Sequence, residues 1–288
     1  MESGATFIGF GEAAMAFARP GGRCYDLKFD DASLREGKRA DCARAGVTAC
    51  DTPADALRGA RMILSLVTAD HALVAARTAA PAIEPGALWL DMNSVAPDTK
   101  RAAAAAIGER ARYVDVAVMA PVEPAGLTVP LLVSGPDVAA ALDALAALGF
   151  TSVAVAGPKI GDASAIKMIR SVMVKGLEAL SAECALAAEA AGVRDAVVAS
   201  LDASWPGADW ARRFDYNLDR MMVHGARRAA EMDEVVATLD ALGTGSAMSR
   251  ATAERQRAIG RLHAAPPAGL AHKLRTLLPF LQRLKDAA

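Results

Sequence analysis

The sequence lacks several features that mark specialised classes of protein. Of its 288 residues, 32 are lysine or arginine and 33 are aspartate or glutamate, so the formal net charge is −1. This near-balance argues against a nucleic-acid partner, because nucleic-acid-binding proteins usually present a strongly basic face. No run of about 18 apolar residues is free of charge, so we expect no membrane span or membrane partner. The first six residues also show neither the basic nor the apolar region of a secretory signal.

Cysteine and aromatic residues are also scarce. Cys24, Cys42, Cys50 and Cys184 form no Cys-x-x-Cys pair, and no histidine cluster accompanies them at the spacing of a zinc site. We therefore expect no metal and a reduced, soluble, cytoplasmic protein. Aromatic residues make up only 5% of the chain, whereas alanine is abundant. Because alanine is the residue that costs least in a helix, this composition predicts extensive helix.

Short apolar runs alternate with helical patterns over the first half of the chain. The expected helices include residues 12–19, 69–80 and 99–110. The expected strands are residues 6–10, 23–27, 62–67, 88–92, 113–118, 130–134 and 153–156. This alternation predicts an α/β fold, a doubly wound and mostly parallel sheet with helices on both faces.

The pattern changes after residue 161. Apolar residues recur at steps of three and four from Ile166 to Cys184, which predicts one long helix over 162–191, about 45 Å long at 1.5 Å per residue. Gly192 is a plausible end for it. The remainder is expected to be helical, with breaks at 205–207 and 265–267. We thus predict a nucleotide-binding Rossmann domain over 1–160 and an all-helical substrate and dimerisation domain over 161–288.

The segment Gly9-Phe10-Gly11-Glu12-Ala13-Ala14 directly follows the first expected strand. Two glycines allow a tight turn and close approach of the backbone to a pyrophosphate, and Ala14 permits close packing of helix on strand. The N–H groups at the start of the following helix attract phosphate. The pattern predicts a site for NAD or NADP; the alternative is a strand, turn and helix punctuated by glycine.

The next two strand ends carry further candidates for cofactor contacts. Asp26, near the end of the second strand, could hold both ribose hydroxyls of NAD and would repel the 2′-phosphate of NADP. Lys28 and Arg23 could offset that repulsion, so NAD is favoured without NADP being excluded. The alternative is that Asp26 is a solvated charge. Val67 and Thr68 are expected to pass beside the cofactor.

Asn93 and Ser94 follow the strand that ends near Met92. At a strand terminus both side chains can donate to a ligand, so we expect them to position the substrate, with Asn93 also near the cofactor. Pro97 is placed to begin the next helix. The alternative role for Asn93 and Ser94 is to cap that helix.

Two groups of basic residues lie on helical edges. Lys167, Arg170 and Ser171 share one edge, and a lysine held against an apolar surface can exchange protons near neutral pH. His224, Arg227 and Arg228 share another, where paired arginines could bind a carboxylate or phosphate. From spacing alone, a solvated basic face and a surface ion-pair network are the competing interpretations.

Four motifs, in this order over residues 5–191, resemble the β-hydroxyacid dehydrogenase family, which includes 3-hydroxyisobutyrate and 6-phosphogluconate dehydrogenases. They are Gly9-x-Gly11-x-x-Ala14, Asp91-Met92-Asn93-Ser94-Val95-Ala96-Pro97, Ala120-Pro121-Val122 and Gly161-Asp162-Ala163-Ser164-Ala165-Ile166-Lys167. The C-terminal part resembles a branch in which a helical domain of unknown function, of phosphogluconate-dehydrogenase type, follows the nucleotide domain.

The resemblance implies that Lys167 is catalytic and assists proton transfer at the substrate hydroxyl while hydride passes to nicotinamide. It also implies a homodimer in which the long helix packs across subunits. Arg170 stands where the family usually has Asn, Asn93 replaces its first motif serine, and Glu123-Pro124-Ala125 replaces its Ser-Gly-Gly. Because these changes fall at substrate contacts, the family's substrate cannot be assigned to this chain. Glu123 would repel a carboxylate, and Arg170 could pair with Glu123 or bind the substrate.

The sequence therefore predicts an NAD(P)-dependent oxidoreductase for a small, acidic, hydroxyacid-like substrate. One alternative is an imine or ketone reductase on the same fold, against which the presence of Lys167 argues, because such enzymes often lack it. The other is a nucleotide-binding regulatory protein without turnover.

Overall fold

The computed structural model describes residues 4–286, and side-chain environments up to residue 283. Residues 1–3, on which the absence of a signal sequence partly rests, lie outside this range. The chain divides into two compact units, and the division along the sequence falls between Met168 and Ile169. The N-terminal unit is a Rossmann-like α/β domain and the C-terminal unit is all helical, as expected. The division lies eight residues after the boundary between 160 and 161 that the sequence suggested.

An eight-stranded sheet forms the centre of the N-terminal unit, with strand order β3-β2-β1-β4-β5-β6-β7-β8. The strands are β1 (Thr6–Ile8), β2 (Arg23–Tyr25), β3 (Thr48–Ala49), β4 (Met62–Ser65), β5 (Ala87–Asp91), β6 (Ala111–Val118), β7 (Leu131–Ser134) and β8 (Val153–Gly157). Neighbours pair in parallel except β6 and β7, which pair antiparallel. All seven expected strands are present, whereas β3 was missed because two residues carry no periodic signal.

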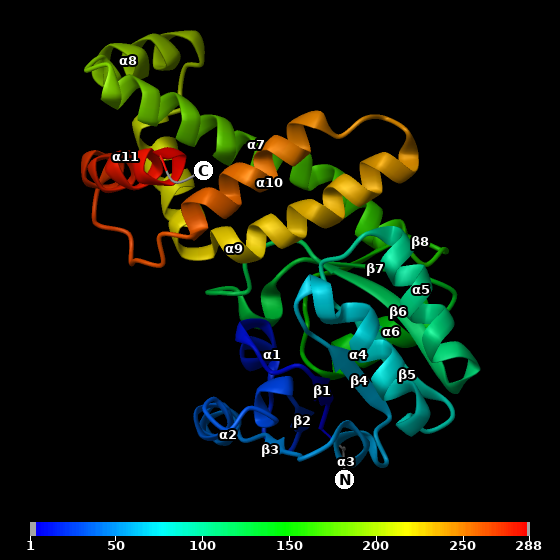
Figure 1. Ribbon diagram of the computed structural model, residues 1–288. Coiled ribbons are helices and arrows are strands. Elements are labelled where there is room, and N and C mark those ends of the chain that lie inside the picture. The colour runs from blue at the N-terminus through cyan, green and yellow to red at the C-terminus, as the bar shows by residue number, and fades with distance from the viewer. Residues whose placement is uncertain (1–3, 287–288) are drawn as a thin grey trace. The chain divides into compact units, whose positions relative to one another are not determined.

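Helices cover both faces of this sheet, as the βα alternation predicted (Figure 1). One face packs against α1 (Glu12–Phe17), α2 (Arg35–Arg44) and α6 (Val138–Ala147), and the other against α3 (Pro53–Leu57), α4 (Ala72–Ala79) and α5 (Pro97–Ile107). Short 3-10 turns lie at Leu27–Phe29, Ala69–His71, Ala80–Ala82, Gly108–Arg110 and Gly126–Thr128. The expected helices 69–80 and 99–110 are thus each part α-helix and part 3-10 turn.

The long helix α7 (Asp162–Ala190) begins in the N-terminal unit and continues into the C-terminal one. It ends before Gly192, whose φ of 71° belongs to the left-handed region that favours glycine. The other helices are α8 (Arg194–Ser204), α9 (Trp210–Leu242), α10 (Ala247–Gly260) and α11 (Leu270–Asp286). The predicted breaks at 205–207 and 265–267 both fall between helices. No helix within residues 4–286 is long and apolar enough to cross a membrane.

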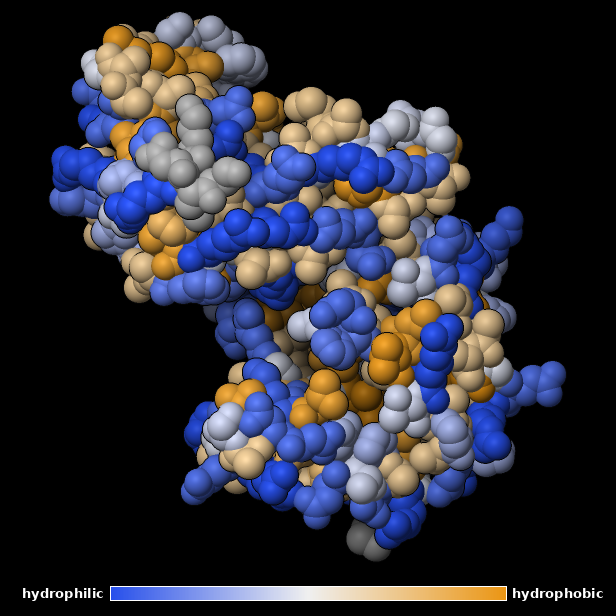
Figure 2. Space-filling view, in the orientation of Figure 1, coloured by the Kyte–Doolittle hydropathy of each residue, from blue (hydrophilic) through white to orange (hydrophobic). Residues whose placement is uncertain are grey.

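Helices α9 and α10 approach each other closely at Gly225 and Gly260. A Cβ added to Gly225 would lie 2.5 Å from the carbonyl oxygen of Gln256 and 2.7 Å from Cα of Gly260. Only glycine allows the two backbones to come this near. The outward faces of α9 and α10 carry rows of hydrophilic side chains (Figure 2), while α7, α9 and α11 contribute buried apolar residues such as Leu186, Leu218 and Leu274 to a shared core.

Candidate active site

The glycine-rich turn after β1 adopts a backbone conformation that a larger residue could not. Gly9 has a φ of 87°, and a Cβ there would lie 2.4 Å from the carbonyl oxygen of Leu66. Its N–H donates to the carbonyl oxygen of Tyr25 at 2.8 Å, which ties the turn to β2. A Cβ on Gly11, which is exposed at the start of α1, would meet nothing within 4 Å. The turn therefore leaves open space beside the backbone, which fits a dinucleotide pyrophosphate.

The peptide of Phe10 is held on both sides by charged side chains. Its N–H donates to Oδ2 of Asp26 at 2.7 Å, and its carbonyl oxygen accepts from Nζ of the buried Lys38 at 3.0 Å. The other oxygen of Asp26 accepts from the N–H of Lys28 at 2.9 Å. Asp26, which we predicted to bind ribose, thus also fixes the glycine turn. About two of the four lone-pair sites of a carboxylate remain for a ligand. Sequence analysis missed the role of Lys38 at the turn, because its contact with Phe10 spans 28 residues.

The loops after β4 and β5 are joined through Asn93. Its Oδ1 accepts from the N–H of Val67 at 2.7 Å, and its Nδ2 donates to Oγ of Ser65 at 3.0 Å and to Oδ1 of Asp91 at 2.8 Å. Asn93 is buried, whereas Thr68 is exposed and contacts Nδ1 of His71 at 3.0 Å. The amide of Asn93 is therefore engaged within the protein, and its predicted contacts with substrate and cofactor stay predictions.

Strand order places these loops at one edge of the sheet. Strands β2 and β3 follow β1 on one side of it, and β4 then lies on its other side, so the strand order reverses between β1 and β4. Ligands of open α/β sheets bind in the crevice outside the carboxyl ends of the strands at such a reversal. The glycine turn, Asp26, Val67 and Asn93 all follow the carboxyl ends of strands next to this point.

Lys167 and Ser94 are brought together from positions 73 residues apart. Nζ of Lys167, in the second turn of α7, donates a hydrogen bond to Oγ of Ser94, which lies three residues after β5. Both residues are half-buried, so the contact is shielded and still reachable. The sequence predicted both as site residues, and the structure joins an amine that can carry a proton to a hydroxyl that can pass one on.

Lys100, Asp91 and Asp115 form a buried ion triad, all with 0% exposure. Nζ of Lys100 lies 2.8 Å from Oδ1 of Asp91 and 3.2 Å from Oδ1 of Asp115. Burial lowers the pKa of Lys100, but the two carboxylates together outweigh it and raise the pKa above its ordinary value, so the side chain stays cationic. Sequence analysis missed Lys100, because a lysine near the start of an alanine-rich helix gives no sign of burial.

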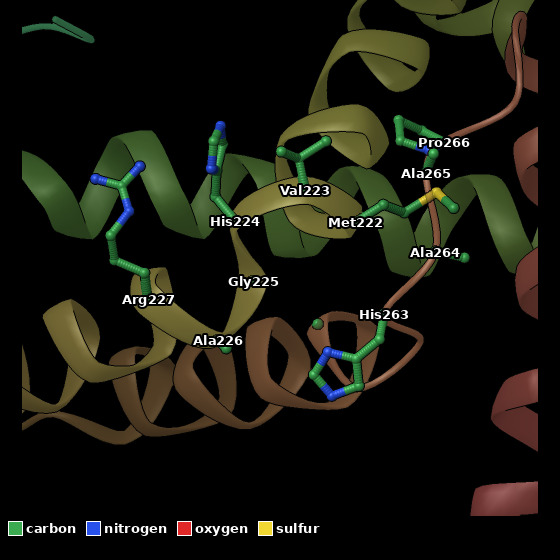
Figure 3. A pocket seen from close by; sticks show the side chains of 11 residues that line it. Met222, Val223, His224, Gly225, Ala226, Arg227, His263, Ala264, Ala265 and Pro266 are labelled. Carbon is green, nitrogen blue, oxygen red and sulfur yellow. The ribbon is translucent and has the colours of Figure 1, made fainter. Parts of the chain in front are cut away.

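The basic edge predicted on α9 is divided between two environments. Arg228 is buried and donates to Glu178 through Nε, at 3.0 Å, and through Nη2. His224 and Arg227 project from one side of α9 and line a cavity of about 560 Å³, while His263 lies apart from them (Figure 3). Arg227 lies 3.6 Å from Glu231. The structure therefore does not bring the three predicted residues together.

The other predicted substrate contacts lie in different settings. Arg170 is exposed on α7, and Ser171 beside it is buried. Glu123 is exposed in the loop between β6 and β7. Among residues 4–286 no cluster of three or more metal-ligating side chains occurs.

A Rossmann-like sheet with a glycine turn open to a pyrophosphate is typical of NAD(P)-binding oxidoreductases. Two family models match the chain. Residues 27–157 match the NAD-binding domain of 6-phosphogluconate dehydrogenase, and residues 188–259 match a domain of unknown function (DUF1932).

Solved structures extend these matches over nearly the whole chain. A conserved hypothetical protein from Sinorhizobium meliloti is 38% identical, with a TM-score of 0.71, and the match covers 98% of this chain and 97% of that one. A conserved protein of unknown function, described as structurally similar to 3-hydroxyacid dehydrogenases, is 29% identical with a TM-score of 0.66, covering 90% and 98%. The 3-hydroxyisobutyrate dehydrogenase of Mycobacterium tuberculosis shares the fold at 15% identity and a TM-score of 0.73, covering 96% and 99%. The chain thus combines an NAD-binding domain of the 6-phosphogluconate dehydrogenase type with a C-terminal domain of unknown function, and it shares its fold with 3-hydroxyacid dehydrogenases.

Proposed function

We propose that the protein is an NAD(P)-dependent dehydrogenase of small, acidic, hydroxyacid-like substrates, with Lys167 as general acid and base. The observation that carries this proposal is the hydrogen bond from Nζ of Lys167 to Oγ of Ser94, near the carboxyl end of β5. A dehydrogenase needs a group that exchanges a proton with the substrate oxygen, and these two side chains form a short path for that proton.

The nicotinamide cofactor, when bound, accepts hydride from the carbinol carbon. In oxidation the neutral amine of Lys167 takes the proton of the substrate hydroxyl, and in reduction the ammonium returns it. Ser94 orients the amine and can donate its own hydroxyl proton to the same oxygen. Such assistance contributes roughly 10²–10⁴ in rate. The half-buried position of both residues limits the water that competes for the proton.

The cofactor contacts follow the strand ends. The glycine turn supplies the open space and the first turn of α1 the backbone N–H groups for the pyrophosphate, Asp26 the ribose contact, and Val67 and Thr68 the neighbouring wall. The full proposed set is Gly9, Phe10, Gly11, Glu12, Ala13, Ala14, Asp26, Val67, Thr68 and Asn93. The carboxylate of Asp26 supports NAD over NADP, because it would repel a 2′-phosphate.

The acidic group of the substrate is assigned to Arg170. It follows Lys167 by three residues, so the two side chains are neighbours on the surface of α7, and its guanidinium is exposed. Ser171 and Asn93 are proposed to assist in positioning the substrate. His224 and Arg227 form the second proposed contact set. Arg228 is held in its buried pair with Glu178 and would have to leave it to reach a substrate.

The apolar side of α7 supports a homodimer. Large apolar side chains along it are 40–64% exposed at Ile169, Met173, Leu177 and Leu180. Their spacing of four, four and three residues places them on one stripe of the helix. Contiguous apolar area of this kind marks protein interaction sites, and a second copy of the chain is the partner that the family resemblance implies.

Lys167→Met tests the catalytic assignment. A panel of hydroxyacids and sugar acids, assayed with NAD and with NADP by nicotinamide absorbance, should show turnover by the wild type that falls by about 10² or more in the variant. The control is Lys159→Met, an exposed lysine that precedes α7. Full turnover by the Lys167 variant would refute the role of Lys167. Turnover of cyclic imines but of no hydroxyacid would favour a reductase, and cofactor binding without any turnover would favour a regulatory protein.

A further inference from the structure

The start of α7 is capped by side chains from the sheet. Oδ2 of Asp115 accepts hydrogen bonds from the N–H of Gly161 at 3.2 Å and of Ser164 at 3.0 Å. Oγ of Ser134 accepts from the N–H of Ala163 at 3.0 Å and lies 3.2 Å from Oδ2 of Asp115, to which it donates. Backbone donors in the first turn of α7 are thus bonded to β6 and β7, and Lys167 follows in the next turn.

The loop that carries Ser94 is held in a similar way by Asp91. Oδ1 of Asp91 accepts from the N–H of Asn93 at 3.0 Å and from its Nδ2 at 2.8 Å. Oδ2 accepts from the hydroxyl of Tyr113 at 2.7 Å. Ser94 is the next residue after Asn93, so its position depends on this anchor.

Lys100 connects the two anchors. Asp91 and Asp115 are directly paired residues of the neighbouring strands β5 and β6. Two like charges in this arrangement repel each other. Nζ of Lys100 donates to the carbonyl oxygen of Asp91 at 2.6 Å and to its Oδ1, and it forms an ion pair with Asp115. One ammonium therefore holds both carboxylates at a fixed separation.

We propose that the Lys100–Asp91–Asp115 triad is a positioning device that sets the Lys167 amine against the Ser94 hydroxyl, by fixing the helix start on one side and the loop on the other. For the part of Lys167 in proton transfer, this inference rests on the proposed function. The triad touches no substrate. Its effect is geometric, and a displacement of about 1 Å at a reacting group can cost 10²-fold in rate.

The energetics of buried charge agree with this role. Buried ion pairs are often no more stabilising than well-packed apolar residues of the same volume, because desolvation opposes the attraction. Stability alone therefore gives little reason to place three charges at this point. Here each carboxylate also accepts hydrogen bonds from backbone or side-chain groups next to Lys167 or Ser94, and apolar residues could not replace those bonds.

Ser134→Ala and Asp115→Asn test the proposal on the full-length protein. Both loosen the cap of α7 without touching Lys167 or Ser94. Ile107→Val is the matched control, because it removes one buried methyl group from the same helix as Lys100 and leaves every hydrogen bond of the cap in place. Thermal unfolding identifies the variants that fold, and Ser134→Ala, the smaller change, serves if Asp115→Asn does not.

The first readout needs no substrate. Limited acetylation with acetic anhydride, followed by mass spectrometry, gives the reactivity of Lys167 relative to the exposed Lys159. We expect a rise of about fivefold in the two cap variants, as the contact with Ser94 is released, and no rise in Ile107→Val. In the dehydrogenase assay we expect kcat to fall about tenfold or more, with the KM for the cofactor unchanged.

Unchanged Lys167 reactivity in a folded cap variant would overturn the positioning role, whatever its activity. Unchanged kcat in the cap variants of an active enzyme would overturn it too, while the proposed function would stand. If the wild type turns over no substrate and acetylation still rises, the proposed function fails and the positioning role stands.

Discussion

Replacing the buried Lys100 with Met should strongly destabilise the N-terminal unit. The substitution keeps an unbranched side chain out to Cε but removes the ammonium group, so two like-charged carboxylates stay buried without a cation. Removal of one partner from a buried pair costs about 3–5 kcal/mol. Domains are stable by about 5–15 kcal/mol, so the loss is about a fifth of the total or more.

A double-mutant cycle identifies the cause of that loss. In Lys100→Met combined with Asp115→Asn, one of the opposed charges is also gone, so the loss should be smaller than the sum of the two single losses by about 1 kcal/mol or more. Arg101→Met is the control, because Arg101 is the next residue of α5 and forms an exposed pair with Asp98. It should change stability by less than about 0.5 kcal/mol.

Urea unfolding measures these changes if the signal is confined to the N-terminal unit. Trp89 is buried there, whereas Trp205 and Trp210 belong to the C-terminal unit, so replacing the latter two by Phe leaves one local probe. Additive losses, within about 0.5 kcal/mol, would refute the electrostatic coupling between Lys100 and Asp115. A loss as small as that of Arg101→Met would refute the buried triad itself.

Three further predictions concern the C-terminal unit. Gly225→Ala should reduce the free energy of unfolding by about 1–3 kcal/mol, because the added methyl group overpacks α9 on α10. The control is Gly176→Ala in α7, where a Cβ would meet only a side-chain oxygen of Thr252 at 4.0 Å, so this change should be neutral or stabilise by up to about 1 kcal/mol. Thermal unfolding measures both. Burial lowers the pKa of Lys175 below its ordinary 10.5. Between these two values the unfolded chain binds more protons than the folded one, so the free energy of unfolding should rise with pH. Urea unfolding at several pH values should show a smaller rise in Lys175→Met. Met173→Lys with Leu180→Lys should convert a dimer to monomers in light scattering at unchanged helicity by circular dichroism, and a wild type that is already monomeric would contradict the proposed interface.

Features with a local cause could be predicted from the sequence. Continuous apolar runs predict strands β1, β4 and β5. Gly9 predicts the turn after β1, because glycine readily adopts the positive φ that this turn requires. Lys167 and Ser94 were each found from a motif and its spacing. Their contact was not, because it joins segments 73 residues apart.

Charged side chains with distant partners could not be placed in the same way. Arg227 and Arg228 are adjacent in sequence, yet successive residues of an α-helix point about 100° apart. That rotation leaves the Arg227 side chain 49% exposed and buries the Arg228 side chain against Glu178, 50 residues earlier. Lys100 is buried by the same geometry, since one step along α5 separates it from the exposed Arg101. Charge patterning therefore locates a helical edge but does not say which charge is a ligand and which is an anchor. Lys100 and Arg228 are anchors of this kind, because each is buried and paired with a carboxylate.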